Sequence, residues 1–174
     1  IPNQTVAGNH DNHNGDHNGP LSPFAQFIPA AAYYDQAERL WPEDSSYHAM
    51  DEVVDPATGA VITPGEDNSN SYVLFSAGGL DFVAVGLSYG VTDEEVDWAD
   101  SIFQRYSDRN GILVTHGYLG ASSQPDGRNA SLGADGGRLY DYVVRNNDNI
   151  FLVLGGHFHG IGTNVETIRG AKID

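Results

Sequence analysis

The chain has 174 residues and a formal net charge of −16, with 24 acidic residues against eight Lys and Arg. Such an acidic surface repels nucleic acid and anionic membranes, so we expect neither as a partner. No cysteine is present, which excludes thiolate metal sites and disulfides, and no apolar stretch approaches the length of a membrane span. The acidity favours solubility and fits an extracytoplasmic or secreted setting.

The first part of the chain is irregular. Residues 1–7 form a short apolar lead-in that predicts a strand, and residues 8–19 have the Gly, Asn and Asp content of a loop. Residues 30–40 predict a helix, because Pro29 precedes them and Trp41-Pro42 follows them. We interpret residues 12–71 as an irregular insert or cap beside the site. Its aromatic residues are expected to pack a small subsidiary core: Tyr33, Tyr34, Trp41 and Tyr47.

A hairpin and a helix are expected next. Residues 72–75 and 82–85 are apolar and flank Gly78-Gly79, which predicts two strands joined by a turn. Thr92 and Glu95 have the spacing of a capping box, which marks the start of a helix. The helix is expected to stop near Asn110-Gly111. Its apolar stripe is expected to face the core: Val96, Ala99, Ile102, Phe103 and Tyr106.

In the last third of the chain, predicted strands again alternate with a helix. Residues 112–115 and 150–154 are short apolar runs that predict buried strands. Between them lie a polar loop over 117–136 and a helix that Asp135 could cap, and residues 163–168 suggest one more strand. The succession of strand, helix, strand, helix and strand predicts an α/β fold, a layered arrangement of a β-sheet and helices.

Three of these segments end in side chains that bind metals. Asn9 follows the lead-in, His116 follows the strand at 112–115, and His157 and His159 follow the strand at 150–154. Open α/β sheets bind ligands at the carboxyl ends of their strands, so these side chains suggest one shared site. Residues two apart in an extended chain face the same way, so both histidines of the pair can point into it. Imidazole suits Zn, Fe and Mn.

The motifs resemble those of a known family. Gly-Asn-His-Asp at 8–11, His116 and Gly-His-Phe-His at 156–159 are similar, in this order, to the last three of five signature blocks of the calcineurin-like metallophosphoesterases. The first two blocks, D-x-H and G-D-x-x-D/N, are absent. The resemblance implies the calcineurin-like phosphoesterase fold, a sandwich of β-sheet flanked by helices. We therefore expect residues 1–174 to be a single, truncated domain of that fold.

The resemblance also implies an activity, the hydrolysis of phosphomonoesters or phosphodiesters. The expected cofactors are two divalent or trivalent metal ions such as Mn, Fe or Zn, with a metal-bound water or hydroxide as the nucleophile. The implied ligands of one metal are Asn9, His116 and His157. By the same resemblance His159 would bind the other metal, His10 would protonate the leaving oxygen or stabilise its charge, and Asp11 would hold the His10 ring.

Other interpretations stay open. Without the first two blocks the chain could be a catalytically inactive fragment, or a noncatalytic binding domain of the same fold. A mononuclear zinc hydrolase is another possibility, with the ligands His116, His157 and His159. Three loop residues close to the first motif are either extra ligands or parts of a solvated loop: His13, Asp16 and His17.

Overall fold

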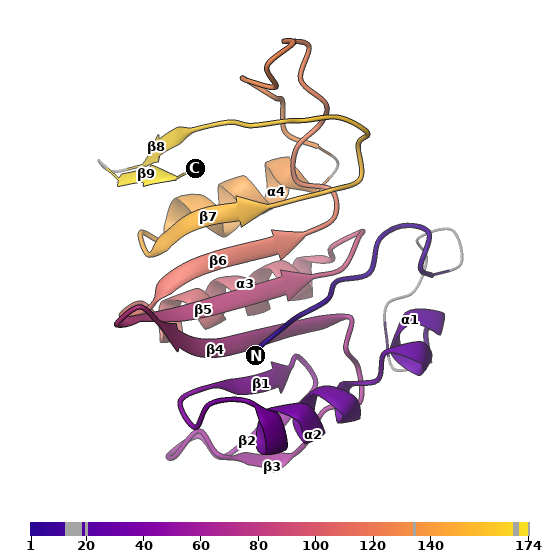
Figure 1. The fold of residues 1–174 in the computed structure, drawn as a ribbon, viewed down its shortest axis with the longest axis vertical. Helices are drawn as coiled ribbons and strands as arrows, with labels where there is room; N and C mark the ends of the chain where they lie inside the picture. Colours follow the sequence, from indigo (N-terminus) through magenta and orange to yellow (C-terminus); the bar gives the residue numbers. More distant parts are fainter. Residues whose placement is uncertain (13–18, 20, 134, 169–170, 174) are drawn as a thin grey trace.

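A mixed five-stranded sheet, in the order β1-β4-β5-β6-β7, organises the computed structural model (Figure 1). The structure describes residues 1–12, 19, 21–133, 135–168 and 171–173. Strands β1, β4 and β5 are antiparallel, whereas β5, β6 and β7 run parallel. The bounds of the strands are Ser46–Ala49 (β1), Asn70–Ala77 (β4), Leu80–Leu87 (β5), Asn110–Thr115 (β6) and Ile150–Leu154 (β7). The expected α/β class, the hairpin and the strand at 112–115 are confirmed. The strand expected at 150–154 is present, but it is not buried: β7 lies at the edge of the sheet, and Phe151 and Leu154 are exposed.

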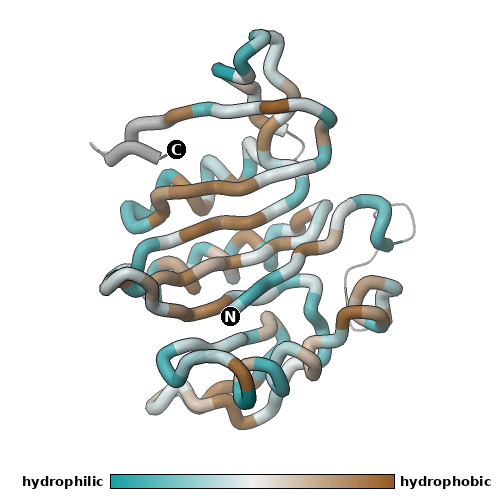
Figure 2. Tube along the Cα trace, in the orientation of Figure 1, coloured by the Kyte–Doolittle hydropathy of each residue, from teal (hydrophilic) through white to brown (hydrophobic). Residues whose placement is uncertain are grey.

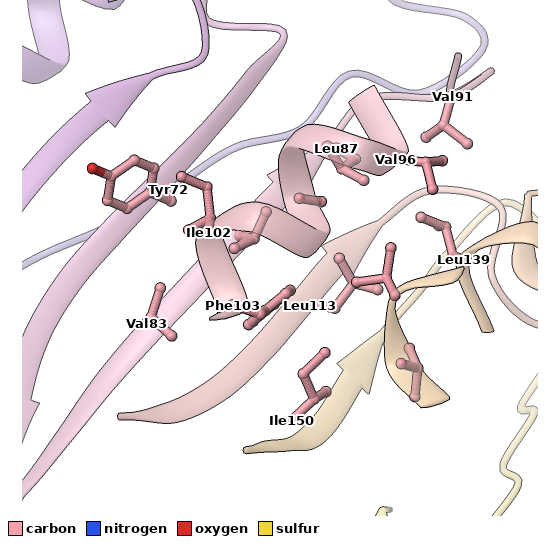
Figure 3. Close-up of a cluster of buried hydrophobic side chains, with 14 of the residues drawn as sticks. Tyr72, Val83, Leu87, Val91, Val96, Ile102, Phe103, Leu113, Leu139 and Ile150 are labelled. Atoms are coloured by element: carbon pink, nitrogen blue, oxygen red, sulfur yellow. The ribbon is translucent and has the colours of Figure 1, made fainter. Parts of the chain in front are cut away.

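Two helices cover one face of this sheet, α3 (Asp93–Arg105) and α4 (Gly136–Tyr142) (Figure 1). The main core lies between them and the strands, where apolar side chains from both layers meet (Figure 3). Both hydrogen bonds of the predicted capping box at Thr92 are present. The helix ends at Arg105, earlier than predicted, because Asn110 already belongs to β6 and the Asn149 amide donates to the carbonyls of Phe103, Tyr106 and Arg109.

On the opposite face, helix α2 (Ala30–Leu40) packs only over β1 and β4, at one end of the sheet. There the apolar strands, brown in Figure 2, are crossed by the N-terminal segment, which is not the predicted strand. The side chain of Gln4 donates to the carbonyl of Ser71, and a Cβ at Gly86 would lie 2.9 Å from the Val6 side chain. Residues 1–7 therefore pack over β4 and β5 instead of extending the sheet. A groove of about 800 Å³ remains open on this face.

The described part of residues 12–71, which was expected to be irregular, contains two helices and three short strands. Helix α1 spans Pro23–Phe27, and α2 spans Ala30–Leu40 as predicted. Strand β1 pairs with β4 and so belongs to the main sheet, and β2 (Val53–Val54) and β3 (Val61–Thr63) form a small hairpin. The predicted aromatic core is confirmed, since a second buried cluster contains Tyr33, Trp41 and Tyr47, with Tyr34 packed against it.

The C-terminal part lies beside β7, the edge strand of the sheet, and forms a separate two-stranded sheet. A short 3-10 helix, η2 (Val144–Asn146), follows α4, and β8 (Glu166–Ile168) pairs with β9 (Ala171–Ile173). Only the end of the strand expected at 163–168 is therefore a strand. Asp135 does not cap α4 with its side chain, which instead accepts a hydrogen bond from Gly90 N. None of the helices in the described parts of the chain has the length and apolar character needed to span a membrane.

Candidate metal centre

The structure brings three of the predicted ligands together. Asn9 Oδ1 lies 3.0 Å from His116 Nε2 and 3.2 Å from His157 Nδ1, and the two ring nitrogens are 3.1 Å apart. His116 and His157 follow Asn9 by 107 and 148 positions in the chain. His116 directly follows β6, and His157 follows β7 after two glycines. The site thus lies at the carboxyl ends of two parallel strands, as open α/β sheets favour.

Hydrogen bonds alone do not satisfy this triangle of atoms. The Asn9 oxygen only accepts, and each ring nitrogen carries at most one proton in the plane of its ring. If both rings donate to Asn9, their two N–H groups face each other. If His157 donates to His116, two lone pairs face each other between Asn9 and His116. Every distribution of protons therefore leaves one repulsive edge, which a shared cation would remove.

The spacing of the three atoms also fits a shared ion. Two donor atoms that each lie about 2.1 Å from one metal, at angles of roughly 90–110°, are themselves about 3.0–3.4 Å apart. The three measured separations span 3.0 to 3.2 Å. Two imidazole nitrogens and a neutral amide oxygen are a donor set that suits Zn, Mn or Fe. The residues present therefore fit a metal ion held by Asn9, His116 and His157.

Asn9 is positioned by the chain that leads into it. Ala7 N donates to the Ser88 hydroxyl at 3.0 Å, and Tyr89 N donates to the Ala7 carbonyl at 2.9 Å. Both partners directly follow β5, which places the first motif at the same edge of the sheet as His116. Gly8 N donates to the Asp11 carboxylate at 2.7 Å, which closes the turn around Asn9.

Two glycines leave room for the His116 ring. A Cβ at Gly8 would lie 3.0 to 3.2 Å from three atoms of the ring, tighter than ordinary contacts, and a Cβ at Gly156 would lie 3.5 Å from Nδ1. Gly156 N also donates to the His116 carbonyl at 2.9 Å. The ring therefore lies between the glycines of two motifs, and at Gly8 the approach is closer than a side chain would ordinarily allow.

His157 has an unusual backbone. Its φ is +67°, in the left-handed region that residues other than glycine rarely adopt. Its ring packs against Tyr89, with centroids 5.2 Å apart, and against Phe158 at 4.7 Å. Backbone strain of this kind is concentrated at functional sites. Here it turns the imidazole toward Asn9 and His116.

The remaining predicted residues lie outside this group of three. His159 is exposed and makes no hydrogen bond or ring contact with the triad. The expected alternation fails because β7 ends at Leu154 and the chain bends at His157. Phe158, between the two histidines, is 45% exposed. His10 is exposed, and Asp11 contacts Gly8; their expected roles stay predictions. Three residues lie outside the described part of the chain: His13, Asp16 and His17.

The electrostatics favour neutral imidazole at His116. Burial and the neighbouring His157 lower the pKa of His116 below its ordinary value, and this lowering outweighs the opposing effect of the Asp11 and Asp135 carboxylates. A neutral ring keeps the lone pair that binds a metal. His10 also lowers this pKa, so His10, Asp11, Asp135 and His157 all lie within electrostatic reach of the ring.

Sequence reasoning missed two contributors, Tyr89 and Asp135. The Tyr89 ring lies 5.7 Å from that of His116, nearly perpendicular to it. Asp135 lies against Gly117, where a Cβ would be 3.3 Å from its carboxylate oxygen. A usable signal existed for Tyr89, because it comes directly after β5, which is parallel to β6. Asp135 carries no local signal, since a loop brings it to the site.

Comparisons with known proteins give one distant relative. The chain is 26% identical over 159 residues to the uncharacterized protein YvnB of Bacillus subtilis (strain 168). The match covers 91% of this chain but only 10% of the relative, so the chain spans about a tenth of that protein's length. No family model matches the chain, and no solved structure matches it.

Proposed function

We propose that this chain binds a metal ion at Asn9, His116 and His157 and hydrolyses phosphate esters there. The observation that carries the proposal is the triangle of donor atoms at the carboxyl ends of β6 and β7, whose edges of 3.0 to 3.2 Å have the length expected for two ligands of one ion. The similarity of its motifs to those of the calcineurin-like metallophosphoesterases supports the choice of phosphate esters, either phosphomonoesters or phosphodiesters.

Each residue has a distinct role in the proposal. A bound cation would polarise a phosphoryl oxygen and lower the pKa of a coordinated water. Asn9, His116 and His157 hold and orient that ion, and the Asp11 carboxylate fixes the turn that presents Asn9. His10, exposed on the same turn, donates a proton to the leaving oxygen. His159 would bind a second ion.

A centre with one metal is the second candidate, with Asn9 in place of the His159 that was expected for a mononuclear zinc hydrolase. Among the described residues, no three His, Cys, Asp or Glu side chains gather to hold a metal ion, and His159 lies apart from the triad. Asn9, His116 and His157 would then hold a single ion, which would supply a binding site for water or phosphate. Such a centre could bind phosphate without turnover, which is the noncatalytic alternative.

Metal content and turnover, measured on the same variants, test the proposal. The wild-type chain should bind at least one Mn²⁺ or Zn²⁺ by elemental analysis, and His116→Ala should lose it together with all turnover of p-nitrophenyl phosphate. His10→Ala should keep the metal and lose turnover by about 100-fold or more. Asn3→Ala, at an exposed residue of the N-terminal segment, is the control that keeps both.

The outcomes separate the candidates. Two ions per chain support the dinuclear centre, and one ion with turnover supports the mononuclear centre. One ion without turnover supports a binding domain. Metal content that does not change in His116→Ala would rule out the triad as the binding site, and unchanged turnover in His10→Ala would rule out its role as the acid.

A further inference from the structure

A cavity of about 420 Å³ lies beside the metal triad. Its walls come from β7, from the loop after His116, from α4 and η2, and from residues 160–165. Gly155, Gly156 and Phe158 line it, and the same stretch carries His157. The Phe158 ring is 4.7 Å from that of His157, and a Cβ at Gly156 would be 3.5 Å from His116 Nδ1. The cavity and the triad therefore share a wall.

The lining of the cavity is uncharged. None of the described residues that line it is acidic or basic, although 18% of the chain is charged. Apolar and aromatic side chains dominate the wall: Leu119, Leu132, Tyr140, Val144, Phe158 and Val165. Small-molecule sites have this volume and this mostly apolar lining. A charged group placed here would be desolvated without an ionic partner, which is costly.

Hydrogen bonds hold the outer wall in place. Thr163 N donates to the Gly127 carbonyl at 2.8 Å, and Ala130 N donates to the Thr163 carbonyl at 3.0 Å. Gly162 approaches the loop closely, because a Cβ there would lie 2.8 Å from the Gly120 carbonyl oxygen. The wall formed by residues 160–165 is thus built onto the loop after β6. A formed pocket binds a ligand without the cost of ordering the chain.

We propose that this cavity receives the uncharged, apolar part of the substrate while the phosphate lies at the metal triad. The proposal rests on the phosphoesterase function proposed above and narrows its substrate class. The substrates are phosphate esters of alcohols or phenols that carry an aliphatic or aromatic group. Esters of small polar alcohols leave the cavity unfilled and are poorer substrates. Burial of the apolar group in the cavity is favourable, because apolar surface of the group is removed from water. Apolar surface of Leu132, Phe158 and Val165 is covered at the same time.

A homologous series of esters measures this effect. The metal-loaded full chain should hydrolyse ethyl, butyl and hexyl phosphate with kcat/KM rising about fourfold for each methylene that is buried. Glycerol phosphate should resemble the ethyl ester. A flat series, with the ethyl ester still hydrolysed, would overturn the cavity proposal and leave the phosphoesterase function standing.

A charge at the mouth of the cavity provides the matched test. Leu132 is 40% exposed, so Leu132→Asp should fold while it makes the cavity unfavourable for an alkyl chain. We expect this variant to lose the dependence on chain length, so that kcat/KM for hexyl phosphate falls to about that for ethyl phosphate. Leu80→Asp, at a 55% exposed position in the hairpin between β4 and β5, is the control and should keep the dependence. Loss of the chain-length dependence in both variants would argue against the cavity as the site of the alkyl group.

A probe without phosphate separates the two proposals. Addition of 1-hexanol should shift the backbone amide resonances of Gly155, Gly156 and Gly162 in NMR spectra, with no ester present. If no ester is hydrolysed, the phosphoesterase function fails. Shifts at these glycines would then still support an apolar-group site, and their absence would overturn it as well.

Discussion

At the scale of single residues, Gly8 sets how closely the His116 ring approaches the loop that carries Asn9. A Cβ at this position would lie 3.0 Å from Cε1 and 3.1 Å from Nε2 of the ring. Gly8→Ala should therefore push the ring or the loop away by tenths of an ångström and weaken metal binding about 10- to 100-fold, as do other changes that misorient ligands. Titration of the apo chain with Zn²⁺ or Mn²⁺ measures the loss.

Gly137 provides the control for this substitution. It lies inside α4, and a Cβ there would meet no atom within 4 Å. Gly137→Ala should leave metal affinity unchanged and raise the free energy of unfolding by about 0.5–1 kcal/mol, because alanine is the better helix former. Wild-type affinity in Gly8→Ala would show that the ring can move without cost and would contradict our account of the site.

The same scale shows what the sequence could not predict about individual ligands. Asn9, His116 and His157 were predicted as ligands of one metal, and the structure brings their donor atoms together. His159 was expected to share the direction of His157, which assumes an extended chain. The positive φ of His157 breaks that period, and a residue other than glycine gives no sign in the sequence that it will adopt such a φ.

At the scale of elements, β6 has one face covered by the helices and the other face beside the open groove. Its residues alternate, with Leu113 fully buried under the helices and Ile112 half-buried on the open face. Leu113→Ala should lower the free energy of unfolding by about 2–5 kcal/mol through lost burial and a cavity. Ile112→Ala removes a side chain of similar size and should cost only about 1 kcal/mol. Urea denaturation monitored by circular dichroism measures both.

The comparison of Leu113 with Ile112 also tests whether the face crossed by residues 1–7 is open. Equal losses for the two variants would mean that this face is as well covered as the other. The N-terminal segment contacts it through Gln4 and Val6, near β4 and β5, and leaves a groove beside Ile112 and Val114.

Elements with a local signal were the ones predicted. Helix α2 lies between Pro29 and Trp41, α3 begins with a complete capping box, and the hairpin of β4 and β5 turns at two glycines. Strand β1 was missed because it has four residues and is stabilised by pairing with β4. Residues 1–7 were apolar enough to predict a strand, but they bury their apolar side chains by packing over the sheet instead.

At the scale of the whole molecule, the net charge of −16 opposes an anionic substrate. Added salt screens this repulsion, since the Debye length falls from about 30 Å at 0.01 M to about 8 Å at 0.15 M. We therefore expect KM for a doubly charged phosphomonoester to fall about two- to tenfold over this range. A singly charged phosphodiester should respond less. Steady-state kinetics at fixed metal occupancy measure both, and a KM that rises with salt would contradict repulsion by the whole surface.

By itself, the sequence determined the composition of the site and the order of its parts. Short apolar runs followed by Asn or His are visible without a structure, because burial and turn chemistry act over a few residues. Only the tertiary structure decided which of those side chains meet. Asn9 reaches His157 across 148 positions of the chain, through the parallel pairing of β5, β6 and β7 and the crossing of the N-terminal segment. Such contacts depend on the register of distant strands, which no local pattern encodes.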